Sequence, residues 1–172
     1  RDSNKDMELN VWDRIIAFEG RMHEFIKAAY DYQDNTFHSH PGYYIDYFEM
    51  RLAQLQVLHN LHYEIKKIRK MPKQALVIAD YIMYMADYVV EMNIPDQQIE
   101  KLEEISEQMK QEELPKTREE FEGRALLYHI LMDLEEFLVY KKRFVNGLDE
   151  KKLRIYWKQE MEQKAVSYTH LT

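Results

Sequence analysis

The stretch TREEFEGRALLYHILMDLEEFLVYKKRFVNG, residues 117–147, decides the fold class of this chain. Thr117 followed by Glu120 is a capping box, which predicts a helix that begins near Arg118. Leucines then recur at spacings of four, three and four residues, the apolar seam of a long bundle helix: Leu127, Leu131, Leu134 and Leu138. A second row is expected to widen this apolar face: Phe121, Ala125, Tyr128 and Met132. Asn146 and Gly147 predict the end of the helix.

The same periodicity occurs in the segments before it. Residues 7–32 and 43–70 each carry apolar positions at alternating three- and four-residue spacings, so both are expected to be long helices. Residues 73–92 are apolar on most sides, which predicts a central helix. Pro95 interrupts the chain, and residues 96–112 predict a shorter, more polar helix. Long helices joined by short loops favour an all-α, antiparallel up-down bundle of four long helices plus one or two short ones.

The composition fits a globular helical protein and excludes several classes of function. The chain has 172 residues with only 4 Gly and 4 Pro, so few residues break its helices. The net charge of -7 argues against nucleic acid as a partner, because phosphate binding needs a basic surface. Without cysteine the chain has no disulfide and no thiolate chemistry. No apolar run approaches the roughly 20 residues of a membrane span, so we expect the domain itself to be soluble.

We expect three parts along the chain. Residues 1–147 form the helical bundle domain, and residues 148–164 form an extra C-terminal helix. Residues 165–172 break the charged helical pattern and are expected to be a vector-derived tail outside the fold. Because the chain opens on Arg1 rather than on Met, we expect it to be a fragment of a longer protein.

Signatures of known catalytic sites are missing from the sequence. The four glycines stand alone, so there is no glycine-rich phosphate loop. His23-Glu24 begins like the HExxH zinc motif, but Lys27 occupies the position of the second histidine. No Glu-x-x-His pair occurs, which removes the di-iron pattern of helical bundles. We therefore expect no catalytic residue, no resident metal and no cofactor.

Three histidines carry the strongest alternative, a metal-dependent helical-bundle enzyme. His59 and His62 are spaced i, i+3 and share a helix face. His129 on the last long helix could approach them, and three imidazoles can bind zinc. The competing interpretation, which we prefer, is that all three are polar residues at the edge of the core.

Tyrosine and arginine supply further candidates, for ligand binding. Tyrosine occurs 13 times, and Tyr47 belongs to a crowded run at the start of the second helix. Aromatic walls with polar tips can bind aromatic or anionic ligands, although packing at the wet edge of a bundle is the commoner role. Arg51 and Arg124 lie in apolar stretches and either could bind a carboxylate bidentately, but Glu120 is the obvious internal partner of Arg124. The candidate ligand-binding set is Tyr47, Arg51, His59, His62, Arg124, Tyr128 and His129.

Two segments together resemble a known family. They are HPGYYIDYFEMRLAQLQVLHNL, residues 40–61, and LPKTREEFEGRALLYHILMDLEEFLVYKKRF, residues 114–144. The pattern LPxTREEFExRAxLxHxxxxxEx(F/Y)L in the second segment is similar to the C-terminal domain of aromatic acid exporters of Gram-positive bacteria, relatives of the fusaric acid resistance type permeases. The resemblance covers residues 6–145, and its motif residues are Arg118, Glu119, Glu120, Phe121, Arg124 and His129.

This resemblance implies a parent protein with N-terminal transmembrane helices, followed by this domain at the cytoplasmic face of the bacterial plasma membrane. The membrane part would carry transport, and this chain lacks it. The chain is thus expected to be a non-catalytic exporter domain with a role in ligand sensing, gating or oligomerisation. Its expected partners are its own transmembrane domain, a second copy of itself in a homo-oligomer and an aromatic acid ligand.

Two basic clusters lead to a hypothesis about orientation. One cluster, residues 66–73, closes the second helix, and the other, residues 141–143, closes the last. If residues 73–92 and 96–112 act as one kinked rod, both clusters lie at one end of the bundle. Basic clusters are favourable near an anionic cytoplasmic leaflet, whereas lysine and arginine also favour helix C-termini for local electrostatic reasons.

Overall fold

The computed structural model describes residues 3–36, 41–88 and 94–148. Five α-helices make up this part of the chain: α1 Ser3–Thr36, α2 Pro41–Ile65, α3 Ala75–Asp87, α4 Asp96–Lys110 and α5 Arg118–Asn146. No strand occurs in these ranges, so the predicted all-α class is confirmed. The helix expected after residue 148 and the expected tail at residues 165–172 lie outside the described residues.

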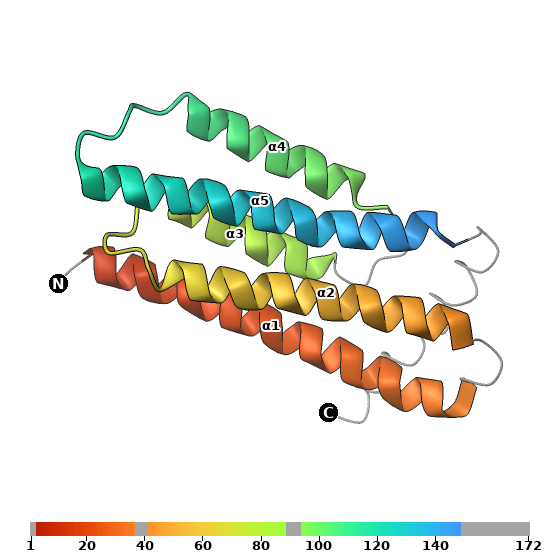
Figure 1. The fold of residues 1–172 in the computed structure, drawn as a ribbon. Coiled ribbons are helices and arrows are strands. Elements are labelled where there is room, and N and C mark those ends of the chain that lie inside the picture. Colours follow the sequence, from red (N-terminus) through yellow and green to blue (C-terminus); the bar gives the residue numbers. More distant parts are fainter. Residues whose placement is uncertain (1–2, 37–40, 89–93, 149–172) are drawn as a thin grey trace.

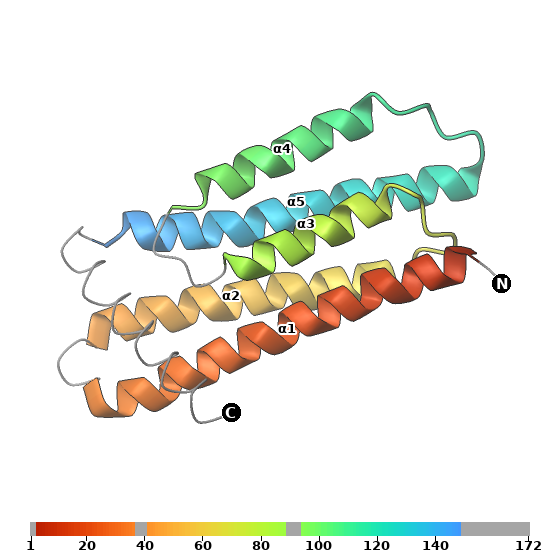
Figure 2. The same ribbon diagram turned by 180° about the vertical axis from the view of Figure 1, so that it is seen from behind.

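Successive helices run in opposite directions along one axis. α1, α3 and α5 point one way and α2 and α4 the other, as predicted for an up-down bundle (Figure 1). Seen from behind, α4 lies on the outside of the bundle next to α5 (Figure 2). α2 packs most extensively against α5, and α1 packs against both α2 and α3.

The helix lengths differ from the expected pattern of four long helices. α1, α2 and α5 have 34, 25 and 29 residues, whereas α3 and α4 have only 13 and 15. The second helix was expected to reach residue 70, but α2 ends at Ile65 and turns follow, with Ile68 N donating to Ile65 O at 3.1 Å. Ile68 and Met71 remain buried, so this segment belongs to the core although it is not helical.

A main apolar core runs along the bundle, and a second, smaller cluster lies between the start of α2 and the end of α5. The seam of α5 is the best predicted part of the main core. The four leucines of that seam are at most 4% exposed. The second row was expected to widen this face, but Phe121 and Met132 are 63% and 65% exposed. That expectation is wrong because these two side chains lie on a side of α5 that faces solvent, away from the leucine seam.

The predicted capping box fixes the start of α5. Thr117 is extended, with φ -124° and ψ 161°, and its Oγ1 accepts a hydrogen bond from Glu120 N at 3.1 Å. The Glu120 carboxylate reaches back and accepts from Lys116 N at 2.8 Å, one residue earlier than in the usual capping box. This bond from Lys116 N is the main cause that holds the pKa of Glu120 below its usual value. The cap therefore sets the register in which α5 presents Arg124 and Tyr128.

The segment after α2 lies very close to α5. A Cβ atom at Gly123 would be 3.1 Å from Pro72 Cγ and 3.2 Å from Lys70 O. These distances are shorter than ordinary carbon contacts, so the absence of a side chain at Gly123 is what allows this approach. The end of α2 and the beginning of α5 are thus fixed at the same end of the bundle.

The hypothesis that both basic clusters share one end of the bundle is wrong. α3 and α4 do not form one kinked rod. They run antiparallel, and Tyr81 Oη donates to Gln98 O at 2.6 Å between them. α5 consequently ends at the opposite end of the bundle from the end of α2 (Figure 1). Only the cluster at residues 66–73 lies at the end where α1 begins; the cluster at residues 141–143 lies at the far end.

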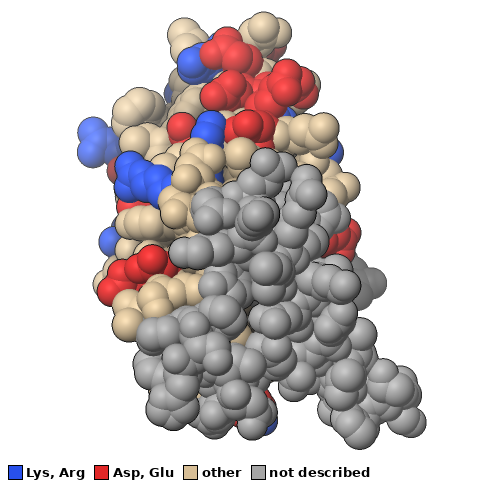
Figure 3. Space-filling model, turned by 90° about the vertical axis from the view of Figure 1, so that its right-hand side faces the viewer, with Lys and Arg blue, Asp and Glu red and all other residues tan. Residues whose placement is uncertain are grey.

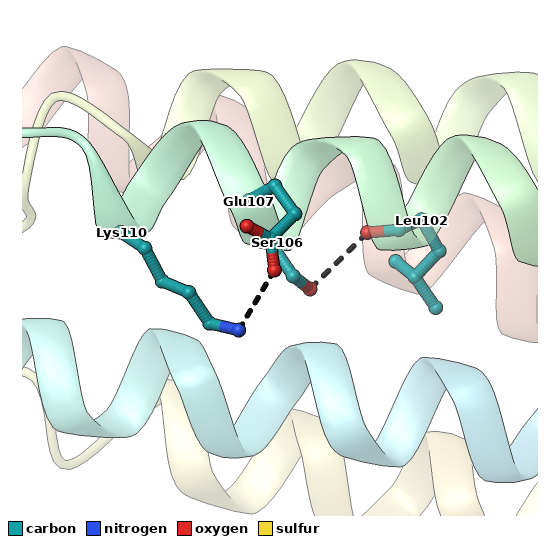
Figure 4. A network of polar contacts seen from close by, with 4 residues as sticks. All are labelled: Leu102, Ser106, Glu107 and Lys110. Carbon is teal, nitrogen blue, oxygen red and sulfur yellow. Dashed lines mark hydrogen bonds and ion pairs between the residues drawn. The ribbon is translucent and has the colours of Figure 1, made fainter.

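The outer side of α4 is acidic. Acidic side chains gather toward the top of the molecule, over α4 (Figure 3). On α4, Lys110 Nζ pairs with Glu107 Oε1 at 2.8 Å and Ser106 Oγ donates to Leu102 O at 3.1 Å (Figure 4). These contacts lie within one helix, so they support α4 without joining it to another element.

Candidate functional site

Tyr47 and Arg51, two of the candidate ligand-binding residues, lie together inside the core. Arg51 Nε donates to Tyr47 Oη at 3.1 Å, and Arg51 Nη1 donates to Gln54 Oε1 at 3.0 Å. Gln54 Nε2 donates in turn to Phe137 O at 3.0 Å, which joins α2 to α5. Arg51 and Gln54 are fully buried, and Tyr47 is 1% exposed. These side chains bind polar atoms of the protein itself, and a ligand would reach them only if the core opened.

The tyrosines at the start of α2 form a closed apolar cluster. Tyr43, Tyr44 and Tyr47 are 8%, 4% and 1% exposed. The ring centres of Tyr43 and Tyr47 lie 5.7 and 5.9 Å from that of Phe144 on α5. Aromatic rings at such distances stabilise one another beyond the area that they bury. This geometry favours the packing interpretation of the tyrosine run.

The three histidines of the metal-enzyme alternative do not converge. His59 is exposed on α2. His62 Nδ1 lies 3.2 Å from Glu19 Oε1 of α1. His129 Nε2 on α5 instead lies 2.7 Å from Glu64 Oε1 of α2. Among the described residues, these three imidazoles therefore offer no common position for a metal ion.

Arg124 and Tyr128, the remaining two candidates, line one pocket beside the end of α4. The pocket has a volume of about 230 Å³. Apolar and aromatic side chains, two cations and one carboxylate form its wall: Met109, Lys110, Glu112, Leu114, Pro115, Phe121, Arg124, Ala125 and Tyr128. Leu114 and Phe121 are 84% and 63% exposed, so solvent reaches this apolar wall.

Arg124 keeps its positive charge available at this pocket. Its Nη1 donates to the backbone carbonyl of Glu113. The carboxylate of the expected partner, Glu120, instead accepts the hydrogen bond from Lys116 N. Within the described part of the chain no carboxylate forms an ion pair with Arg124, and a neutral carbonyl does not cancel its charge.

A second hollow, of about 370 Å³, adjoins the first at the same end of the bundle. It shares Glu112, Leu114 and Arg124 with the first pocket. The rest of its wall mixes lysines with glutamates, among them Lys70 and Lys116. Arg124 is thus the cation that lines both hollows.

A carboxylate pair between α2 and α5 was not among the sequence candidates. Glu64, whose side chain is 14% exposed, lies beside His129 and Asp133 of α5. Burial, followed by the hydrogen bond and the repulsion from Asp133, raises the pKa of Glu64 to about 7. The i, i+4 spacing of His129 and Asp133 was visible in the sequence, but nothing in the sequence showed that Glu64 would face them.

The described helices make an all-α up-down bundle, and none of them is long and apolar enough to cross a membrane. The sequence model of a family described as "Putative aromatic acid exporter C-terminal domain" matches residues 3–142. The chain therefore belongs to this transporter-associated family, and the resemblance that residues 40–61 and 114–144 carry is confirmed.

Two individual proteins are also similar. The Bacillus subtilis (strain 168) protein named "Uncharacterized protein YqjA" is 32% identical over 98 residues, which are 57% of this chain and 30% of that relative. The aligned part is therefore less than a third of the relative's length. A crystal structure titled "Crystal structure of putative membrane protein from Clostridium difficile 630" superposes with a TM-score of 0.59 at 20% identity, covering 82% of this chain and 95% of that one. This last likeness supports the fold.

Proposed function

We propose that this bundle is the non-catalytic, cytoplasmic C-terminal domain of an aromatic acid exporter whose N-terminal part spans the membrane. The observation that carries this proposal is the family match across residues 3–142. The aligned region accounts for only 30% of the Bacillus relative, which leaves that protein ample length for a membrane part. In this arrangement the transmembrane part precedes α1 at the cytoplasmic face of the bacterial plasma membrane.

Within that role, we propose that the domain senses the aromatic acid at the pocket of Arg124 and Tyr128. An apolar cavity of about 150 Å³ holds benzene, so 230 Å³ suffices for one ring with a carboxylate. Phe121 and Tyr128 supply aromatic surface for the ring. Arg124 supplies a planar fork of donors that matches the two oxygens of a carboxylate, and Lys110 adds a second positive charge.

The test is the melting temperature of the chain with and without 4-hydroxybenzoate. At ten times its dissociation constant a ligand stabilises the folded state by about 1.4 kcal/mol, or about 3–5 °C for a domain of this size. Arg124→Gln should lose this shift. Arg143→Gln, which removes an exposed arginine at the far end of α5, should keep it. No shift of the native chain at millimolar ligand, or an equal shift in Arg124→Gln, would contradict the sensing role.

A second role, holding exporter copies together, is favoured by the outer face of α2. Ile45, Leu52 and Tyr63 are 51%, 59% and 62% exposed there, and exposed apolar rows mark contact surfaces. Light scattering would then give a dimer or larger species that Leu52→Glu converts to a monomer. A monomer at every concentration of the native chain would remove this role and leave the sensing proposal intact.

A further inference from the structure

We infer that Glu64, His129 and Asp133 form a binding site for a divalent transition-metal ion such as Zn²⁺ between α2 and α5. Each side chain offers one ligand atom, and the three atoms lie within 4.8 Å of one another. His129 Nε2 lies 2.7 Å from Glu64 Oε1. Two helices thus converge on one point with an imidazole nitrogen and two carboxylates.

The spacing along α5 makes this convergence rigid. His129 and Asp133 are four residues apart and share one face of the helix. That face meets α2 in the most extensive helix pair of the bundle, next to Leu134 and Leu61, which are both fully buried. The ligands are therefore held by packed helices rather than by loops, which favours a defined coordination geometry.

Two oxygen atoms of this cluster lack a partner in the protein while both carboxylates are ionised. Glu64 Oε2 and Asp133 Oδ2 are buried and accept no hydrogen bond in that state, since a bond between Glu64 and Asp133 needs a proton on one of them. An unpaired buried acceptor costs about 1–3 kcal/mol, and more when it is charged. Two carboxylates side by side also repel each other, and His129 and then Lys67 oppose this repulsion at Glu64. A divalent cation would satisfy both oxygens and neutralise both charges together.

The donor set indicates the class of metal. Imidazole nitrogen with carboxylate oxygen suits Zn²⁺ and its neighbours, whereas Mg²⁺ and Ca²⁺ prefer oxygen alone. Bonds of about 2.1 Å in a tetrahedron place ligand atoms about 3.4 Å apart, so the 2.7 Å contact needs only a small side-chain shift. The His129 side chain is 53% exposed, which gives the ion access from solvent and leaves a position for water.

This site differs from the histidine triad considered from the sequence. It uses His129 without His59 or His62, which face elsewhere. It also goes beyond the sensing role, because Arg124 and Tyr128 contribute no ligand to it. The proposal of metal binding and the proposal of aromatic-acid binding can therefore be tested independently of each other.

Calorimetric titration of the EDTA-treated and dialysed 172-residue chain with ZnCl₂ tests the inference. We expect one equivalent of Zn²⁺ to bind and to raise the melting temperature. Asp133→Asn and His129→Gln should each weaken binding at least tenfold, as loss of a ligand requires. His59→Gln is the matched control, because it removes an exposed imidazole of α2 outside the cluster. It should bind as the native chain does.

Three results would overturn the site. They are no saturable binding by the native chain, equal binding by His129→Gln and Asp133→Asn, or an equal loss in His59→Gln. Circular dichroism of each variant before the titration separates lost metal from lost fold. His129→Gln is the safest variant in this respect, since that side chain is more than half exposed.

Discussion

Two helical glycines should respond to alanine with opposite signs. In an exposed helix interior, Gly→Ala stabilises by about 0.8–1.0 kcal/mol, because alanine loses less backbone entropy. Gly20, in the middle of α1, is exposed and a Cβ there would meet nothing within 4 Å. Gly20→Ala should therefore gain that full amount, which is about 2–4 °C in melting temperature for a protein of this size.

Gly123→Ala would gain the same helix propensity, but there is no free space for the added Cβ atom. Its Cβ would lie 3.1 Å from Pro72 Cγ and 3.2 Å from Lys70 O, and neither a proline ring nor a backbone carbonyl is a flexible end that moves easily. Overpacking of this kind costs about 1–3 kcal/mol. Gly123→Ala should therefore be neutral or destabilising by up to about 2 kcal/mol, and it should lie about 1–3 kcal/mol below Gly20→Ala.

Urea unfolding followed by circular dichroism measures both variants and the double variant. The two sites lie on helices with different neighbours, so their effects should add in the double variant. The denaturant slope should not change, since both variants unfold the same surface. If Gly123→Ala proved as stabilising as Gly20→Ala, the close contact between α5 and the segment after α2 would be refuted.

Three more predictions concern the core, the helix cap and the carboxylate pair. Leu134→Ala removes a fully buried side chain and should cost about 3–4 kcal/mol in urea unfolding. Thr117→Ala should lower the free energy of unfolding by about 1 kcal/mol, because Glu120 N loses its acceptor, and Thr117→Ser should restore most of it. With EDTA present, the raised pKa of Glu64 means that the contribution of Glu64 to stability is fully present below pH 4.5 and is lost as the pH rises through about 7, by up to about 3 kcal/mol. Glu64→Gln should flatten this pH profile, and an unchanged profile would show that Glu64 is not perturbed.

The sequence predicted the parts of the fold that depend on neighbours along the chain. The Thr117 cap involves residues three positions apart, and the leucine seam of α5 repeats every three or four residues. Local hydrogen bonds and helical periodicity suffice for both. The same periodicity overestimated α2, because the buried positions of Ile68 and Met71 continue the apolar pattern beyond the last helical turn.

The parts of the fold that depend on which helices pack against each other could not be predicted from local sequence patterns. The reversal between α3 and α4 is fixed by packing, including the Tyr81 contact with Gln98, and it placed the basic clusters at opposite ends. On sequence alone, Arg51 was a candidate ligand-binding residue. Its burial and its hydrogen bonds to Gln54 and Tyr47 become visible only in the folded structure. Glu64 was missed for the same reason, since its partners come from another helix.

The sensing role requires that this exporter-family domain binds an aromatic acid at the pocket between α4 and α5 that Arg124 and Tyr128 line. The most direct measurement is a titration of the ¹⁵N-labelled chain with 4-hydroxybenzoate, followed by amide chemical shifts. We predict saturable shifts concentrated at residues 109–128, which Arg124→Gln abolishes. Absence of saturable shifts, or shifts concentrated at the hollow near Met50 and Phe144 at the far end of the bundle, would contradict the account.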